Sequence, residues 1–312
     1  MKNLISFAAL SFAVILAVVY PLVTPFPAVD LDVYLRAANG DISDYFYAPW
    51  SLYPFELMRF LPYEVIRIII NLVTILGLWL ACRSFNGSVP VVMTSYALMF
   101  SFYYGQIEGL WAIGLVLMVT GLKRKSHALA VFGWMIVLAK YYIGIPLGLG
   151  LLWCFADFKQ ARTVVFFTGL ALIATFLIYG FWPLDVLQRM AARPPNRLSA
   201  IDTWQYFGPV VLLLWIPVIW TRNRSYTIFA ATWALTTPYI QPHSLTHMLV
   251  TAGPIGVVEH IGYVIGWDKN LVLLQISSLL IYLSPLYPRL RMWLVSIPPF
   301  SRWSSRHPAP SS

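Results

Sequence analysis

Residues 30–38 read Asp-Leu-Asp-Val-Tyr-Leu-Arg-Ala-Ala, and they follow residues 4–22, the first long apolar run of the chain. The segment around them, residues 24–63 and its immediate edge, carries half of the twelve acids: Asp30, Asp32, Asp41, Asp44, Glu56 and Glu64. Carboxylates are costly to place beside apolar segments. Acids gathered in such a place are therefore better candidates for chemistry than for solubility.

The composition is that of a membrane protein. Of 312 residues, 59% are apolar and 11% charged, too few polar residues to cover a water-soluble surface. The excess of 21 Lys and Arg over 12 acids is explained by basic cytoplasmic loops, so we expect no nucleic-acid partner. Cys82 and Cys154 lie near the ends of apolar runs, and their spacing indicates neither a disulfide nor a metal site.

Eleven apolar runs predict an all-α polytopic protein of about ten to twelve transmembrane helices. Several runs are short for a bilayer, so we expect some to break or re-enter. With the N-terminus in the cytoplasm, the basic loops lie inside and most acids lie outside. An odd number of spans would place the basic C-terminal residues outside, so we expect an even number of spans. The runs cover roughly residues 4–22, 65–82, 89–104, 106–122, 128–142, 143–156, 163–182, 207–221, 226–240, 244–265 and 271–287.

We expect one transmembrane domain over residues 1–300, with long outer loops at about 23–63 and 183–206 and a disordered basic tail at 301–312. Loops of this length in a small membrane protein are usually functional. The second loop contains Arg193 and Arg197, which are candidates for binding a phosphate or, alternatively, lipid headgroups.

Asp30 and Asp32 are the first candidates for catalysis. In a helix, Asp32 would share a face with Arg36 while Asp30 would meet Tyr34, so each acid would have its own partner. Desolvation at an apolar boundary alters the pKa of a carboxyl group, which suits a general base that takes a proton from a hydroxyl. The alternative is a pair of solvated loop acids.

Three further polar residues interrupt apolar runs. Gln106 and Glu108, in Gly-Gln-Ile-Glu, are expected at the outer end of the third span, where they either cap the next helix or serve a site; Glu108 there needs a cationic partner. Lys140, expected at the outer end of the fifth span, either snorkels outward or has a function, for which a phosphate is a fitting counter-ion.

His243 and His247 are four residues apart, a spacing that zinc can use on one helical face. They have no Glu between them in the HExxH manner and no obvious third ligand, so we expect neither a metal nor another cofactor. A histidine at an outer helix start is better placed to bind a phosphate, and two structural histidines are the alternative.

Taken together, these motifs resemble the membrane glycosyltransferases of the C-type fold, most closely the family 87 mannosyltransferases that use polyprenyl-phosphate-mannose. The matching motifs occur in the family's order across residues 30–247. They are Asp30-Leu-Asp-Val-Tyr34-Leu-Arg-Ala-Ala, Tyr47-Ala-Pro49 with Leu61-Pro62, Gly105-Gln106-Ile-Glu108, Ala139-Lys140, and Thr237-Pro238-Tyr239 followed by His243.

The resemblance implies a bundle of about a dozen helices with a first outer loop that lies on the membrane and carries the catalytic aspartate. By its position before the tyrosine this is Asp30, acting as general base, with Asp32 as the second choice or an orienting residue. His243 would contact the donor phosphate, and Lys140, Arg193 and Arg197 are further candidates for it. The candidates for the remaining substrate contacts are Tyr34, Arg36, Gln106, Glu108, Tyr239 and His247.

The activity that the resemblance implies is inverting transfer of a sugar, mannose in this family, from a polyprenyl-phosphate donor to a hydroxyl of a lipid or glycan acceptor, as in glycolipid biosynthesis. It would take place at the outer face of the cytoplasmic membrane. The chain is shorter than the family's members, has Glu108 where Asn is usual, and has Thr237-Pro where Ser-Pro is commoner. These departures leave the sugar and the acceptor open. The alternative function is a transporter or flippase of a lipid-linked sugar, for which polar groups near mid-membrane and internal repeats are typical.

Overall fold

The computed structural model describes residues 2–24, 27–192, 207–220, 225–237, 242–260, 278–280 and 282–283. In this part of the chain every regular element is helical, which confirms the predicted all-α class. The elements are α1 Lys2–Val23, α2 Val29–Ala38, η1 Pro49–Leu52, α3 Tyr53–Met58, α4 Tyr63–Phe85, α5 Val89–Met93, α6 Tyr96–Tyr104, α7 Glu108–Lys123, α8 His127–Leu138, α9 Tyr141–Phe155, α10 Phe158–Tyr179, α11 Trp182–Ala192, η2 Gly208–Leu214, α13 Trp215–Trp220, α14 Tyr226–Thr236, η3 Pro242–Leu245, α15 Thr246–Ala252 and η4 Gly253–His260.

Three of the described helices are long and apolar enough to cross a membrane: α1, α4 and α10. Val89–Tyr104 and Glu108–Lys123 are together apolar and long enough for a span, but the chain bends by 119° at the short break between them. If the two segments form one broken span, the described residues contain a fourth crossing. These segments correspond to two of the predicted runs, 89–104 and 106–122, and the break lies between them. The chain is a helical membrane protein, as its composition predicts.

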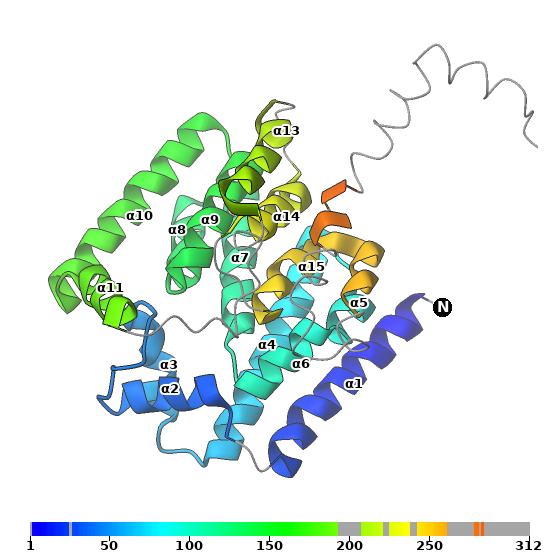
Figure 1. Ribbon diagram of the computed structural model, residues 1–312, viewed down its shortest axis with the longest axis vertical. Coiled ribbons are helices and arrows are strands. Elements are labelled where there is room, and N and C mark those ends of the chain that lie inside the picture. Colours follow the sequence, from blue (N-terminus) through cyan, green and yellow to red (C-terminus); the bar gives the residue numbers. More distant parts are fainter. Residues whose placement is uncertain are drawn as a thin grey trace, which may run out of the picture.

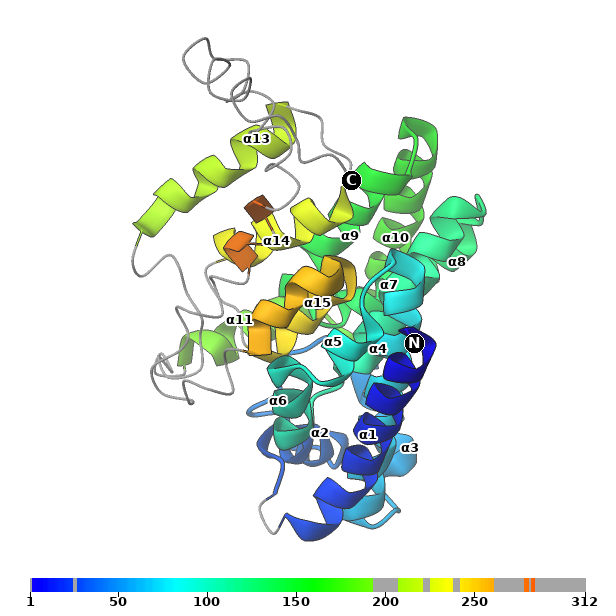
Figure 2. The same ribbon diagram turned by 90° about the vertical axis from the view of Figure 1, so that its right-hand side faces the viewer.

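The centre of the bundle is formed by α4, α7 and α8, with α7 packed between the other two. α1 lies along α4, and α15 packs against α4 and α5 (Figure 2). α7, α8 and α9 have 16, 12 and 15 residues and are shorter than α4. Several helix ends therefore lie inside the bundle rather than at its rim.

Charged residues are separated between the two ends of the bundle. At one end the last turns of α4, α7 and α9 meet: the Phe85 and Phe155 rings are 6.5 Å apart, and Lys123 Nζ lies 5.1 Å from the Phe155 ring. At the other end the Tyr53 and Tyr179 hydroxyls are in contact, and α2 and α3 lie there (Figure 1). The acids of residues 30–64 thus lie opposite the basic ends of α4 and α7, as the charge pattern predicts.

The segment between α1 and α4 has a core of its own. α2 buries Leu31 and Tyr34 on one face, and the Tyr34 ring stacks on Phe55 of α3 at 4.7 Å and 12°. Ile66 of α4 and Trp111 of α7 belong to the same apolar cluster. The segment predicted as an outer loop is therefore a packed helical layer attached to the bundle.

We predict that this layer depends on Phe55. Phe55 is fully buried whereas Leu57, on the same short helix, is 81% exposed. Phe55→Ala should cost on the order of 3–5 kcal/mol, and the matched control Leu57→Ala less than about 0.5 kcal/mol. Thermal unfolding of the purified protein in detergent micelles measures both, and equal shifts in the two variants would contradict this packing.

Candidate functional site

Asp30 is positioned by two contacts that hold α2 against the bundle. The Tyr63 hydroxyl, at the start of α4, accepts a hydrogen bond from the Ala28 amide at 2.6 Å, just before α2 begins. Gly105 follows α6 with φ +68°, and a Cβ atom there would overlap the Cβ atoms of Leu31 and Ala28. Because glycine adopts this conformation without strain, α2 can approach the turn that carries Gln106.

Gln106 connects the two candidate residues of α2. Its amide Nε2 donates a hydrogen bond to Asp30 Oδ2, and its Oε1 accepts one from the Tyr34 hydroxyl at 3.3 Å. The two bonds fix both the orientation of the amide and the position of the carboxylate. Gln106 and Tyr34 are buried, and Asp30 is partly buried.

Burial raises the pKa of Asp30 to about 6. The Gln106 hydrogen bond and the charge of Lys140 act in the opposite direction, and the charge of Glu108 adds to the increase. A carboxylate with this pKa is mostly ionised at neutral pH and yet more basic than an ordinary aspartate, which is the property required of a general base.

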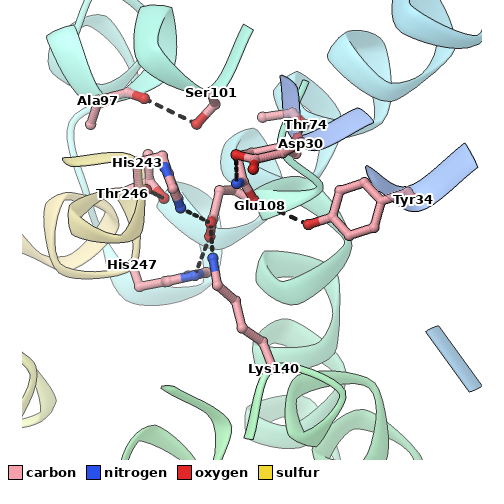
Figure 3. A network of polar contacts seen from close by, with 11 residues as sticks. Asp30, Tyr34, Thr74, Ala97, Ser101, Glu108, Lys140, His243, Thr246 and His247 are labelled. Atoms are coloured by element: carbon pink, nitrogen blue, oxygen red, sulfur yellow. Dashed lines mark hydrogen bonds and ion pairs between the residues drawn. The ribbon is translucent and has the colours of Figure 1, made fainter. Parts of the chain in front are cut away.

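Glu108 is the centre of a second group of charges. Lys140 Nζ lies 2.5 Å from Glu108 Oε1, His243 Nε2 lies 3.4 Å from the same oxygen, and His247 Nε2 lies 2.6 Å from Oε2. Figure 3 shows these three side chains around Glu108, with Asp30 and Tyr34 reaching toward the group from α2. All four residues are at most 1% exposed. We call Glu108, Lys140, His243 and His247 the Glu108 cluster.

The Glu108 cluster explains two residues that were ambiguous in the sequence. Glu108 has the cationic partner that it was expected to need. Lys140 does not snorkel outward: it is buried and pairs with Glu108. Glu108 is the first residue of α7, where the positive end of the helix dipole favours a carboxylate.

The Glu108 cluster lies deep along α4. Thr74 is the middle residue of α4, about 16 Å from either helix end at 1.5 Å per residue. Its hydroxyl donates a hydrogen bond to the Gln106 carbonyl at 3.4 Å. Gln106 and Glu108 therefore lie level with the middle of α4, at the boundary between the end of α6 and the start of α7. α6 thus ends and α7 begins inside the bundle.

Both histidines retain unused hydrogen-bonding capacity. Within the described residues, the Nδ1 atoms of His243 and His247 are buried and have no hydrogen-bond partner. In the same part of the chain, no group of three or more His, Cys, Asp or Glu side chains has the arrangement of a metal site.

The remaining predicted residues lie apart from the Glu108 cluster or outside the described residues. Arg36 is exposed and pairs with Asp41 at 3.5 Å and Asp44 at 3.0 Å, so its predicted pairing with Asp32 is wrong. Asp32 interacts instead with the Tyr63 hydroxyl, and of the two aspartates it is Asp30 that faces Gln106. Arg193, Arg197 and Tyr239 lie outside the residues that the structure describes.

Three buried polar residues of α4 were not recognised in the sequence. Arg67 donates to the Phe102 carbonyl at 3.4 Å, and Asn71 donates to the Ala17 carbonyl at 3.2 Å. With Thr74 they are spaced by four and three residues, so they share one face of the helix. Polar residues at helical spacing within an apolar run were the signal that could have identified this face.

An aromatic cavity of about 640 Å³ lies beside these polar groups. One of its lining residues, Tyr104, interacts electrostatically with Asp30, and another, Phe100, has its ring 5.8 Å from that of His243. A ligand with an apolar part in this cavity would bring a polar part to Asp30. The cavity is lined by Leu16, Tyr20, Tyr96, Met99, Phe100, Phe102, Tyr103 and Tyr104.

Comparison of the chain with protein-family models, with curated proteins and with solved structures finds no match. The family resemblance therefore stays a prediction, and the geometry described above has to support any function.

We predict strong energetic coupling between Glu108 and Lys140. Glu108→Gln or Lys140→Met alone leaves a buried charge without its main partner, at a cost of about 3–5 kcal/mol. The double variant removes both charges and should recover much of that loss. Thermal unfolding in micelles, analysed as a double-mutant cycle, measures the coupling.

The exposed pair of Arg36 and Asp44 is the matched control for this cycle. Its coupling should be at most about 1 kcal/mol, because water screens both charges. Additive losses at Glu108 and Lys140 would show that the buried pair does not form.

Proposed function

We propose that the protein is an integral-membrane glycosyltransferase that moves a sugar from a polyprenyl-phosphate donor to a hydroxyl of a lipid or glycan acceptor. The observation that carries the proposal is the carboxylate of Asp30, which has a raised pKa, is held by Gln106, and interacts electrostatically with Tyr104, a residue that lines an apolar cavity. A lipid-linked donor combines an apolar chain with a polar reacting group, and such a ligand suits this pairing. Mannose is the sugar that the sequence motifs favour.

The proposed reaction is a single displacement that inverts the anomeric carbon. Asp30 takes the proton from the acceptor hydroxyl as the oxygen attacks that carbon. The bond from the carbon to the phosphate oxygen breaks, and polyprenyl phosphate leaves with the electron pair. Gln106 holds the base in place through its hydrogen bond to Asp30, so it is a positioning residue in this proposal rather than a substrate contact.

The leaving phosphate needs positive charge or hydrogen-bond donors. In the proposal, Lys140 and His243 supply them, with Arg193 and Arg197 of the second predicted outer loop as further contacts. Because Lys140 already pairs with Glu108, a bound phosphate would compete with Glu108 for that ammonium group. Glu108 would then keep the charge of Lys140 compensated while the donor site is empty.

The proposal includes the finer features of the predicted architecture. These are the C-type glycosyltransferase fold with ten to twelve membrane helices, and a site at the outer face of the cytoplasmic membrane. The separation of acids and basic residues between the two ends of the bundle supports the orientation. A donor already carrying its sugar on a lipid suits that face, which nucleotide sugars do not reach.

Transport or flipping of a lipid-linked sugar is the second candidate function. The position of Glu108 and Lys140, level with the middle of α4, favours it, because transporters hold polar sites near mid-membrane between broken helices. We rank it second because Asp30, with its basic carboxylate, lies beside the cavity and is not needed for passage. Movement of a fluorescent lipid-linked sugar across proteoliposomes without sugar transfer would reverse this order.

We predict that Asp30→Asn abolishes sugar transfer, with a loss of at least about 10²–10⁴-fold. The measurement is transfer of labelled mannose from polyprenyl-phosphate-mannose to extracted native lipids by purified protein. Donor binding should be nearly unchanged, because the amide keeps the shape of the side chain. Asp32→Asn is the matched control and should retain transfer; the opposite pattern would assign the base to Asp32.

We further predict that transfer is lost as the pH falls through about 6, because Asp30 must be deprotonated to accept a proton. Gln106→Leu should move this acid limb to higher pH, since it removes the hydrogen bond that lowers the pKa of Asp30. The measurement is the pH dependence of kcat/KM. An unchanged limb in Gln106→Leu would show that Gln106 does not act on the base.

A further inference from the structure

α11 follows the candidate membrane span α10 after only two residues. Gly180 has φ +70°, a conformation that favours glycine, and it lets the chain turn sharply at the end of the span. Figure 1 shows α11 turning away from the axis of α10, at the end of the bundle where α2 and α3 lie. The helix therefore begins where a membrane crossing ends.

The side chains of α11 fall into three groups around the helix. Trp182 and Val186 are buried against the protein. Leu184, Leu187 and Met190 are exposed by 48%, 60% and 48%. Asp185 and Gln188 are also exposed, and each lies about 160° around the helix from the apolar residue two positions later, Leu187 and Met190 respectively. The three sides of α11 therefore suit three different surroundings: the protein interior, an apolar medium and water.

The apolar side of α11 continues an exposed apolar surface at the end of the candidate membrane span α10. At the end of α10 the residues Leu177 and Ile178 are exposed by 84% and 69%, and Phe181 between the helices by 61%. Exposure of this surface to water would cost roughly 25 cal/mol per Å² of apolar area. A bilayer boundary, in contrast, satisfies an apolar side and a polar side of the same helix at once.

We propose that α11 is an interfacial helix that lies in the plane of the bilayer surface, with Leu184 and Leu187 inserted among the lipid chains. Asp185 and Gln188 then face water and the headgroups. The inference does not depend on the proposed enzymatic function, because it uses only exposure and the position of α11 after α10.

The buried side of α11 connects this membrane contact to the candidate site. The Trp182 ring lies 5.5 Å from that of Trp50 and 6.2 Å from that of Tyr141. The Tyr141 hydroxyl also donates to Met190 Sδ at 3.3 Å. Since Tyr141 directly follows Lys140, the depth at which α11 rests sets the depth of the chain segment that carries Lys140.

The test measures where labels on α11 lie in a bilayer. An environment-sensitive fluorophore is attached at Leu187→Cys and, as the matched control, at Asp185→Cys on the opposite side; Leu184→Cys is a second label on the apolar side. Cys82 and Cys154 are buried, so the parent protein is the labelling blank. Each protein is reconstituted into phosphatidylcholine vesicles and quenched either by lipids brominated in their acyl chains or by aqueous iodide.

At Leu187 and Leu184 we expect brominated lipid to quench several-fold more strongly than at Asp185, and iodide to quench mainly at Asp185. Equal iodide quenching at all three positions would place both sides of α11 in water and overturn the proposal. A Leu187 label that neither quencher reaches would show that protein covers the apolar side, either another segment or a second copy, and would also overturn it.

Discussion

A carboxylate buried among apolar side chains is stable only when positive charge or hydrogen-bond donors surround it, and Glu108 imposes this requirement on the whole bundle. Lys140, His243 and His247 meet it from two other parts of the chain. α7, the turn before α9, and the region of η3 and α15 must therefore converge on one point. The helices near that point are short because their ends, rather than their sides, have to supply the polar groups.

Helix ends inside a bundle expose backbone groups that lipid cannot satisfy. The turn from α6 to α7 resolves this through Gln106, whose carbonyl accepts from Thr74 and whose side chain binds Asp30 and Tyr34. The same turn thus joins the Glu108 cluster to α2. Because these helix ends need polar partners, the carboxylate of Asp30, the ion pair of Glu108 and Lys140, and the aromatic cavity lie in one region. This arrangement can support chemistry on an amphiphilic ligand.

Much of this region could be predicted from the sequence, because polar residues in an apolar chain have few partners except one another. Asp30, Gln106, Glu108 and Lys140 were selected on that ground, and the structure brings them together. Their depth could not be predicted, since hydropathy gives the length of a run but not its offset from neighbouring helices. The partners of Arg36 were missed because they follow α2 in a turn that folds back, and helical spacing alone does not describe such a turn.

The ion pair between Glu108 and Lys140 also constrains how the protein is made. The two residues are 32 positions apart, and each alone would oppose entry of its helix into the bilayer by about 2.5–3.5 kcal/mol. The segment from α7 to the start of α9 therefore has to leave the insertion machinery as one unit, with the two charges already neutralising each other. His243 and His247 emerge from the ribosome about a hundred residues later and complete a site whose charge balance has been set before they arrive.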